Sequence, residues 1–313
     1  MKIGAYEMES PLMNAGGLVK SVKDVRLMAE TPVGAVLAGS YTLEPRVGNS
    51  PNGEQVYYHD GITGITYNAL GMPNKGLREV AKELPEMIKI AHDNGKPFIL
   101  NLAPVSTDPL SEIVEMGKVL EEAGIDNLDG IELNASCPNV VTADGGRHSL
   151  LSHSPGLLQQ VAFELSDIGA NEVPFGTLLV RISPLLAEED ARKLVISLQQ
   201  SGVNVISAFN GFGGGTPLDE QGNPRLQVPG GIGGKSGSGM SSQAEKQTAW
   251  LVAARNDTKA NLEIIGSNGV TNAETMKRRL DLGVAAVGAT TLFWESRRWG
   301  EAASKLLEDF AQL

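Results

Sequence analysis

Residues 130–139 read GIELNASCPN, a short and mostly apolar run that passes directly into a polar loop. Runs of this kind are typical of strands that are buried on both faces of a parallel sheet. The loop holds Cys137, the only cysteine of the chain, between Asn134 and Asn139. An isolated cysteine is usually a small buried hydrophobe, but a thiol among amides at a strand's end is well placed to move a proton. We therefore interpret Cys137 as a catalytic residue.

The same type of apolar run recurs along the chain, at residues 33–38, 65–68, 98–102, 177–182, 203–207, 262–266 and 285–288. Amphipathic helical stretches lie between most of these runs, at 77–94, 188–201 and 273–282, and Pro85 is expected to kink or split the first. Alternating strands and helices over about 300 residues predict an α/β protein of the closed (β/α)8 type, a TIM barrel. An open doubly wound sheet is the alternative, disfavoured because no Gly-x-Gly-x-x-Gly follows the first strand. We predict one domain over residues 1–313.

Composition narrows the class of protein. The chain is 41% hydrophobic and 20% charged, and no apolar run approaches the length of a membrane helix, roughly 20 residues. A net charge of −11 without clustered Lys and Arg argues against nucleic-acid binding. The four histidines do not pair at the spacing of metal ligands, so no metal site is predicted. A single cysteine and the lack of a secretory signal favour the cytoplasm.

Polar side chains are expected at the carboxyl ends of the predicted strands, where all of them face one cavity if the barrel forms. An amide can both donate and accept a hydrogen bond, which suits a ligand with an imide or lactam edge. A single strand-end asparagine often only caps its loop, but three at comparable positions favour a binding site. The strand-end set is Ser40, Asn68, Asn101, Asn134, Arg181, Ser207 and residues 267–269.

Two glycine turns follow the last two predicted strands, one at Gly269 and one at Gly288. Bare backbone N–H groups at such turns, with a helix N-terminus behind them, form a pocket for an anion. Barrels that bind a phosphorylated ligand often use the loops after strands seven and eight. The sequence therefore predicts a ligand that carries a phosphate; the alternative is a pair of ordinary tight turns.

Several motifs resemble those of the class 1 dihydroorotate dehydrogenases, which are (β/α)8 flavoproteins with FMN at the barrel mouth. The most specific are residues 42–49 (TLEPRVGN), 68–74 (NALGMPN) and 132–139 (ELNASCPN). Weaker similarities are residues 14–17 (NAGG) and 230–235 (GGIGGK), the latter similar to a glycine-rich loop of the homodimeric class 1A branch. The resemblance implies oxidation of dihydroorotate to orotate in pyrimidine biosynthesis, with a hydride passing to FMN N5 and Cys137 as the general base. It also implies a homodimer, and it leaves fumarate or a partner protein as the electron acceptor.

The resemblance also implies a role for individual residues. Asn68, Asn134 and Asn139 match the amides that hold the pyrimidine. Arg181 matches a position at flavin N1 and O2, where a positive charge stabilises the reduced ring, although the family has lysine there; the alternative is an ion pair with a loop carboxylate. The cofactor-binding set is Ala15, Gly16, Ser40, Asn101, Asn134, Arg181, Gly234, Asn268, Gly269, Gly288 and Ala289.

Two positions depart from the family pattern. Gly39 stands where the family has a lysine that contacts flavin and substrate, and Ser207 stands where it has a substrate-binding asparagine. We keep Ser207 as a substrate-binding residue and consider Arg147 or His148 as replacements for the missing cation. Residues 210–225 are expected to form a mobile loop over the barrel mouth. The alternatives are an FMN-dependent oxidoreductase for another cyclic amide or enone, and a non-catalytic relative that binds FMN or a phosphate ligand.

Overall fold

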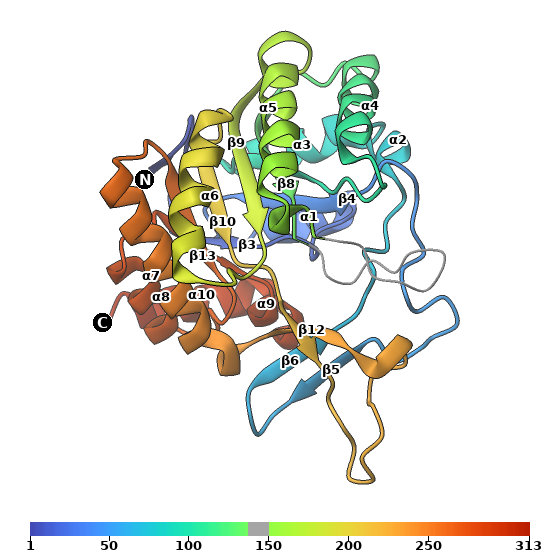
Figure 1. Ribbon diagram of the computed structural model, residues 1–313, viewed down its shortest axis with the longest axis vertical. Helices are drawn as coiled ribbons and strands as arrows, with labels where there is room; N and C mark the ends of the chain where they lie inside the picture. The colour runs from blue at the N-terminus through green and yellow to red at the C-terminus, as the bar shows by residue number, and fades with distance from the viewer. Residues whose placement is uncertain (137–149) are drawn as a thin grey trace.

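The computed structural model describes residues 1–136 and 150–313 of the chain (Figure 1). Its central sheet consists of eight strands in the order β3-β14-β13-β10-β9-β8-β7-β4, and every pairing in it is parallel. The (β/α)8 prediction is therefore confirmed. The strands are β3 (Leu12–Asn14), β4 (Val36–Tyr41), β7 (Phe98–Leu102), β8 (Leu128–Asn134), β9 (Phe175–Ile182), β10 (Val205–Ala208), β13 (Glu263–Ser267) and β14 (Ala286–Ala289).

Between β3 and β4 the barrel is closed by the Asn14 side chain together with single backbone bonds: the Leu12 carbonyl accepts from the Gly34 N–H (2.7 Å), and the Gly39 N–H donates to the Val19 carbonyl (2.8 Å). The Asn14 side chain donates through Nδ2 to the Leu37 carbonyl (2.7 Å) and accepts through Oδ1 from the Leu37 N–H (3.0 Å). Asn14 is fully buried. Its amide thus pairs with a backbone as a neighbouring strand would, which satisfies two buried polar groups of Leu37.

Helices surround the sheet, and Figure 1 shows them packed along its outside. The predicted helix at 77–94 is split, as expected from Pro85, and the predicted helices at 188–201 and 273–282 are present with nearly the same bounds. The helices are α1 (Val22–Ala29), α2 (Leu77–Val80), α3 (Leu84–Asp93), α4 (Pro109–Glu122), α5 (Pro155–Asn171), α6 (Glu188–Gln200), α7 (Ser241–Thr258), α8 (Ala273–Asp281), α9 (Thr291–Ser296) and α10 (Trp299–Phe310).

The inside of the barrel is filled. Side chains from several strands, among them Met13, Leu37, Ile99 and Leu179, form one buried apolar cluster together with Ile3 and Tyr6. Those last two belong to the N-terminal hairpin of β1 (Lys2–Ile3) and β2 (Tyr6–Glu7), which packs against the amino ends of the strands. A ligand is therefore left with the opposite end, where the strands terminate.

A second sheet of four antiparallel strands, in the order β11-β12-β6-β5, projects beside the barrel at the bottom of Figure 1. Its hairpin of β5 (Tyr57–Asp60) and β6 (Ile65–Asn68) comes from the segment after β4. The strands β11 (Phe212–Gly215) and β12 (Gly233–Ser236) come from the segment after β10. Contacts between Asn68 and Gly234, and between Tyr67 and Lys235, join the two segments.

This second sheet corrects two expectations. Residues 65–68 were expected to be a barrel strand, but they pair antiparallel in the projecting sheet, and β3 takes the vacant place in the barrel. Three residues are too few for β3 to show a periodic apolar pattern. Residues 210–225 were expected to be a loop, but residues 212–215 form β11 because β12 offers them a backbone partner.

Three short 3₁₀ turns complete the described chain: η1 (Leu151–His153), η2 (Pro229–Gly231) and η3 (Ser238–Met240). Within residues 1–136 and 150–313, every helix is too short or too polar to span a membrane.

Candidate functional site

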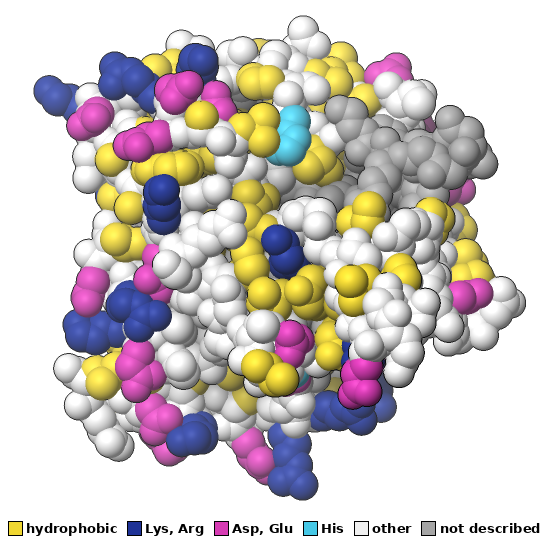
Figure 2. Space-filling model, turned by 60° about the horizontal axis from the view of Figure 1, so that its bottom comes forward, with side chains coloured by type: hydrophobic (Ala, Val, Ile, Leu, Met, Phe, Trp, Pro, Cys, Tyr) yellow, Lys and Arg dark blue, Asp and Glu magenta, His cyan; other side chains and the backbone are white. Residues whose placement is uncertain are grey.

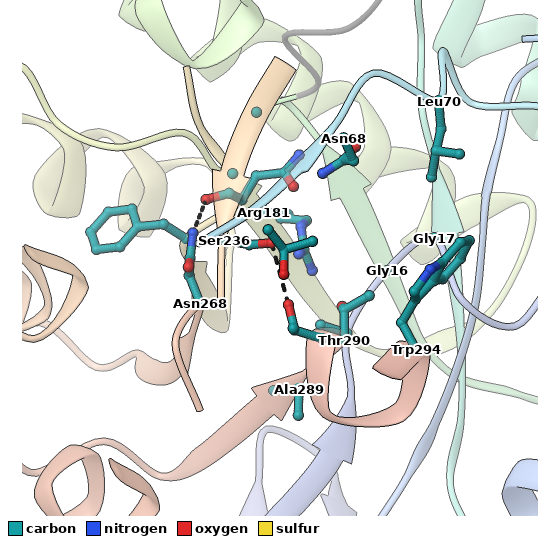
Figure 3. Close-up of a pocket in the computed structure, with 18 of the residues that line it drawn as sticks. Gly16, Gly17, Asn68, Leu70, Arg181, Ser236, Asn268, Ala289, Thr290 and Trp294 are labelled. Atoms are coloured by element: carbon teal, nitrogen blue, oxygen red, sulfur yellow. Dashed lines mark hydrogen bonds between the residues drawn. The ribbon is translucent and has the colours of Figure 1, made fainter. Parts of the chain in front are cut away.

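A cavity of about 1100 Å³, its open mouth included, lies at the carboxyl ends of the barrel strands. Figure 3 shows Asn68 and Leu70 on one side of the cavity, Ala289 and Thr290 on the other, and Arg181 between them. Among the described residues that line it, Arg181 is the only one with a charged side chain.

Arg181 reaches the cavity from the end of β9 and is almost fully buried. Its Nη1 lies 3.8 Å from Oε1 of Glu132, which comes from the neighbouring strand β8 and is also buried. The same Glu132 oxygen accepts a hydrogen bond from Nδ2 of Asn101 on β7. Arg181 therefore forms an ion pair, as the alternative interpretation expected, but its partner Glu132 lies on a strand and not on a loop. The arginine also lines the cavity.

Gly16 packs against the buried side chains of Asn101, Arg181 and Glu132. A Cβ built on Gly16 would be 3.3 Å from Asn101 Nδ2 and 3.5 Å from Arg181 Nη1. The missing side chain therefore leaves Arg181 accessible to a flat ligand that lies on the backbone of residues 15–17. Asn101 Oδ1 is buried and has no partner within the described chain, and an unpaired buried acceptor is costly unless a ligand or water satisfies it.

Asn134 is held in one orientation at the end of β8. Its Nδ2 donates to Ser40 Oγ (2.7 Å), and its Oδ1 accepts from the backbone N–H (3.2 Å) and the Oγ (3.1 Å) of Ser136. Asn210 Nδ2 donates to the Ser136 carbonyl (2.9 Å). Ser136, the last described residue before Cys137, is therefore fixed by two side chains that line the cavity.

The end of the cavity at which the sequence predicts a phosphate is bordered by Gly269 and Gly288. Gly269 follows β13, as predicted, but Gly288 lies within β14 and is not a turn. Gly269 has φ +83°, and a Cβ there would lie 2.5 Å from the Cα of Ser241. A Cβ on Gly288 would lie 2.5 Å from Ser267 Oγ. Gly269 therefore requires glycine, whereas a Cβ at Gly288 would meet only the hydroxyl of a serine side chain. Both residues line the cavity, together with Ala289 and Thr290.

The projecting sheet and α9 form the remaining wall. Ser236 Oγ and Thr291 Oγ1 lie 3.3 Å apart across it, and the rings of Tyr57 and Trp294 pack with centroids 5.5 Å apart. The Tyr57 hydroxyl donates to Glu295 Oε1. Burial, followed by this bond to a carboxylate, raises the pKa of Tyr57, so the phenol stays protonated at neutral pH.

Most of the predicted site residues meet at this one cavity. It is lined by Ala15, Gly16, Ser40, Asn68, Asn134, Arg181, Gly234, Asn268, Gly269, Gly288 and Ala289. Asn68 arrives there from β6 of the projecting sheet, not from a barrel strand as expected. Asn101 and Ser207 are buried in β7 and β10 beneath the cavity and are not part of its wall.

Four residues of the functional prediction, Cys137, Asn139, Arg147 and His148, lie outside the described residues. Their roles stay predictions. Gly39 is described, and it has φ +116° with a would-be Cβ 2.4 Å from the Asn101 carbonyl oxygen. This backbone accepts no side chain at position 39, so the cation that the family pattern places there has no counterpart in β4.

The sequence reasoning missed several lining residues. Leu70, Gly71 and Met72 belong to the recognised motif at 68–74, and its first residue, Asn68, could have drawn attention to them. Thr290 and Thr291 directly follow Gly288 and Ala289, two predicted site residues. Gly17 belongs to the motif at 14–17, Asn210 and Gly211 begin the segment expected over the barrel mouth, and Val270 follows Gly269. No local signal marks the others, because only the pairing of distant segments brings them to the cavity: Tyr57, Thr66, Phe209, Ser236 and Trp294.

The fold and the cavity define a (β/α)8-barrel protein with a candidate ligand site at the carboxyl ends of its strands. Comparison with known proteins then identifies the family. The family model described as dihydroorotate dehydrogenase matches residues 1–309, and the chain belongs to this family. The predicted resemblance is thereby confirmed.

Individual relatives agree. The chain is 26% identical to dihydroorotate dehydrogenase B (NAD(+)), catalytic subunit, of Bacteroides thetaiotaomicron, over 92% of this chain and 85% of that protein. It is 28% identical to the protein of the same name from Archaeoglobus fulgidus, over 95% and 88%. Dihydroorotate dehydrogenase (fumarate) of Trypanosoma brucei brucei is 34% identical, but over only 45% of this chain and 42% of that one.

A solved structure shows the same fold. The structure of dihydroorotate dehydrogenase from Eimeria tenella in complex with ferulenol matches with a TM-score of 0.73 at 18% identity. The match covers 96% of this chain and 80% of that one.

Proposed function

We propose that this chain binds FMN and oxidises dihydroorotate to orotate, the reaction named for its family. The observation that supports this most strongly is the convergence of Asn68, Asn134 and Arg181 on one cavity, in a chain that matches the family over nearly its whole length. Two amides and one cation suit a cyclic amide substrate beside a flavin. We also infer that residues 1–313 act as one FMN-binding unit.

The residues present fit FMN. The loop at Gly269 offers a backbone N–H group for its phosphate, and Ala289 and Thr290 border the same end of the cavity, beside Gly288 of β14. Ala15 and Gly16 provide a flat backbone surface for the ring, and Arg181 provides the charge that favours the reduced form. When bound, FMN accepts the hydride that leaves the substrate.

The chain's own residues would orient the substrate and take its proton. Asn134, fixed by Ser40 and Ser136, would present an amide of defined direction, and Asn68 would approach from β6 of the projecting sheet. Cys137 would remove the proton, and Asn139 would add a polar contact; Ser207 does not line the cavity and has no part in this proposal. A free cysteine has a pKa of about 8.5, so activity should rise through the alkaline range.

The experiment that tests this assignment is Cys137→Ser. Loss of a general base should slow reduction of the bound flavin by dihydroorotate by roughly 10²- to 10⁴-fold. The flavin content of the purified variant should stay equal to that of the unaltered protein, since the thiol is not assigned to cofactor binding. Reduction at an unchanged rate would remove Cys137 from the mechanism.

The electron acceptor is inferred from the relatives. Those that match over nearly the whole chain are named as NAD(+)-linked catalytic subunits, so we propose that electrons pass to a partner subunit. The homodimer implied by the class 1A resemblance stays a prediction, as does fumarate, the acceptor named for the shorter trypanosomal match. The proposal places the reaction in the cytoplasm, on the basis of the single cysteine.

Two observations favour a second candidate function. It is an FMN-dependent oxidoreductase with the same fold that acts on another cyclic amide or enone. Gly39 accepts no side chain, and Arg181 is the only charged side chain among the described lining residues. A substrate without a carboxylate would need no further cation. Reduction of the bound flavin by an uncharged cyclic amide, but not by dihydroorotate, would favour this candidate.

A further inference from the structure

Arg279 of α8 is fully buried and is the largest completely buried side chain in the described chain. Its guanidinium binds three groups, all through Nη atoms. Nη1 donates to Thr248 Oγ1 (2.9 Å), and Nη2 donates to the carbonyl oxygens of Asn268 (2.8 Å) and Ser241 (3.1 Å). Its Nε is buried without a partner in the described residues.

The acceptors of Arg279 are neutral. Within residues 1–136 and 150–313, no carboxylate lies within ion-pair distance of it, and the nearby Glu245 pairs instead with the adjacent Arg278 at 3.1 Å. Burial lowers the pKa of Arg279 to about 10, so the guanidinium still carries its charge at neutral pH. A buried cation without a counter-ion is destabilising unless an anion comes near it.

The bond to Asn268 sets the direction of the next amide. In a planar trans peptide, the C=O and the following N–H point in opposite directions. Because the Asn268 carbonyl points at Arg279, the Gly269 N–H points away from it. Gly269 lines the cavity, and its N–H has no acceptor among the described residues.

The second carbonyl bound by Arg279 belongs to Ser241, where α7 begins. Gly269 is packed so closely on Ser241 that no Cβ would fit between them. Arg279 therefore ties together the two segments that meet at the phosphate end of the cavity. Its carbon chain also packs on Gly266 of β13, where a Cβ would lie 3.4 Å from Arg279 Cδ.

We propose that Arg279 is a positioning residue for the phosphate of the cofactor: it holds the Gly269 N–H toward the phosphate and places an uncompensated positive charge behind that peptide. This inference rests on the proposed FMN function and extends it to a residue outside the cavity wall. The phosphate dianion is the counter-ion that the buried guanidinium lacks within the described chain. Riboflavin, which has the same ring without the phosphate, should not benefit from Arg279.

The test compares FMN with riboflavin. The apoprotein of Arg279→Met should bind FMN roughly 10- to 100-fold more weakly than the unaltered apoprotein, where each factor of ten corresponds to ~1.4 kcal/mol. Its affinity for riboflavin should change by less than about threefold. Quenching of flavin fluorescence on binding measures both affinities without any turnover. Arg278→Met, at the neighbouring exposed position, should leave both affinities unchanged.

A purely structural role would weaken FMN and riboflavin binding equally, and that result would overturn the inference. Should Arg279→Met fail to fold, Arg279→Lys carries the test. Lysine keeps the charge but not the fork that reaches three acceptors, so a smaller loss, specific for FMN, is expected; equal affinity for FMN would overturn the inference. An unaltered apoprotein that binds neither flavin would instead overturn the proposed function, and this inference with it.

Discussion

At the scale of single residues, the site depends on side chains whose positions are fixed by hydrogen bonds and ion pairs. Asn134 is fixed through both ends of its amide, and Arg181 is held beside Glu132 in a nearly dry environment. Their residue types and strand-end positions could be predicted from the sequence. The Arg181–Glu132 pair could not, because it depends on the register of β8 against β9, which places Asn134 opposite Arg181.

Tyr41 gives a residue-scale test of the core. It is fully buried, and its hydroxyl has no partner within the described chain. Burial, and to a lesser degree the charges of Glu83 and Asp24, raise the pKa of Tyr41. The folded protein thus keeps this proton above pH 10, where the unfolded chain releases it, and the free energy of unfolding falls as pH rises, by up to ~1.4 kcal/mol per unit for this group.

Tyr41→Phe should remove this contribution. At pH 7 the variant should be as stable as the unaltered protein or more so, by up to about 1 kcal/mol, because an unsatisfied hydroxyl is lost. Between pH 9 and 11 its advantage should grow. Urea unfolding at several pH values measures the difference, with Tyr58→Phe at a partly exposed position as the control. Parallel pH profiles for Tyr41→Phe and the unaltered protein would contradict the assignment.

At the scale of elements, the closure of the barrel between β3 and β4 could not be predicted from the sequence. Apolar runs of four residues or more predicted seven of the eight barrel strands. The eighth, β3, is only three residues long, and the Asn14 side chain helps to join it to β4. The run at 65–68 has the composition of a strand and is one. Its partners are β5, just before it in the chain, and β12, about 170 residues later; no local pattern could have revealed the second pairing.

Asn14→Ala should destabilise this junction. The substitution removes two buried hydrogen bonds and leaves the N–H and C=O of Leu37 without partners, so we expect a loss of about 2–4 kcal/mol in the free energy of unfolding. Urea unfolding monitored by circular dichroism measures the loss. Asn52→Ala, at an exposed loop position, should change stability by less than about 0.5 kcal/mol. A loss of similar size for the two variants would show that Asn14 does not close the barrel.

At the scale of the whole molecule, the surface of the chain matters for the proposed transfer of electrons to a partner subunit. Figure 2 shows the face on which hydrophobic side chains gather near the middle around a basic one, while charges of both signs are mixed around the edges. The Tyr57–Trp294 pair belongs both to the cavity wall and to the partly exposed surface. Neither the composition nor the apolar pattern could predict this pair, because its two rings come from β5 and α9, which are distant in the sequence.

The names of the relatives lead to a prediction about the isolated chain. If it is a catalytic subunit that needs a partner to reach NAD(+), the purified chain should reduce an artificial dye with dihydroorotate but should reduce NAD(+) at a negligible rate. Steady-state assays with each acceptor, fumarate included, measure this. Rapid NAD(+) reduction by the chain alone would contradict the need for a partner, and rapid fumarate reduction would favour the acceptor of the trypanosomal relative.

The central claim is that a flavin held at this barrel mouth takes electrons from dihydroorotate, and an anaerobic titration tests it most directly. Stoichiometric dihydroorotate should abolish the visible absorption of the bound flavin, and orotate should appear in equal amount. Dithionite should reduce the same sample and so establish that its flavin is reducible. Visible absorption that dithionite abolishes but excess dihydroorotate leaves unchanged would contradict the account.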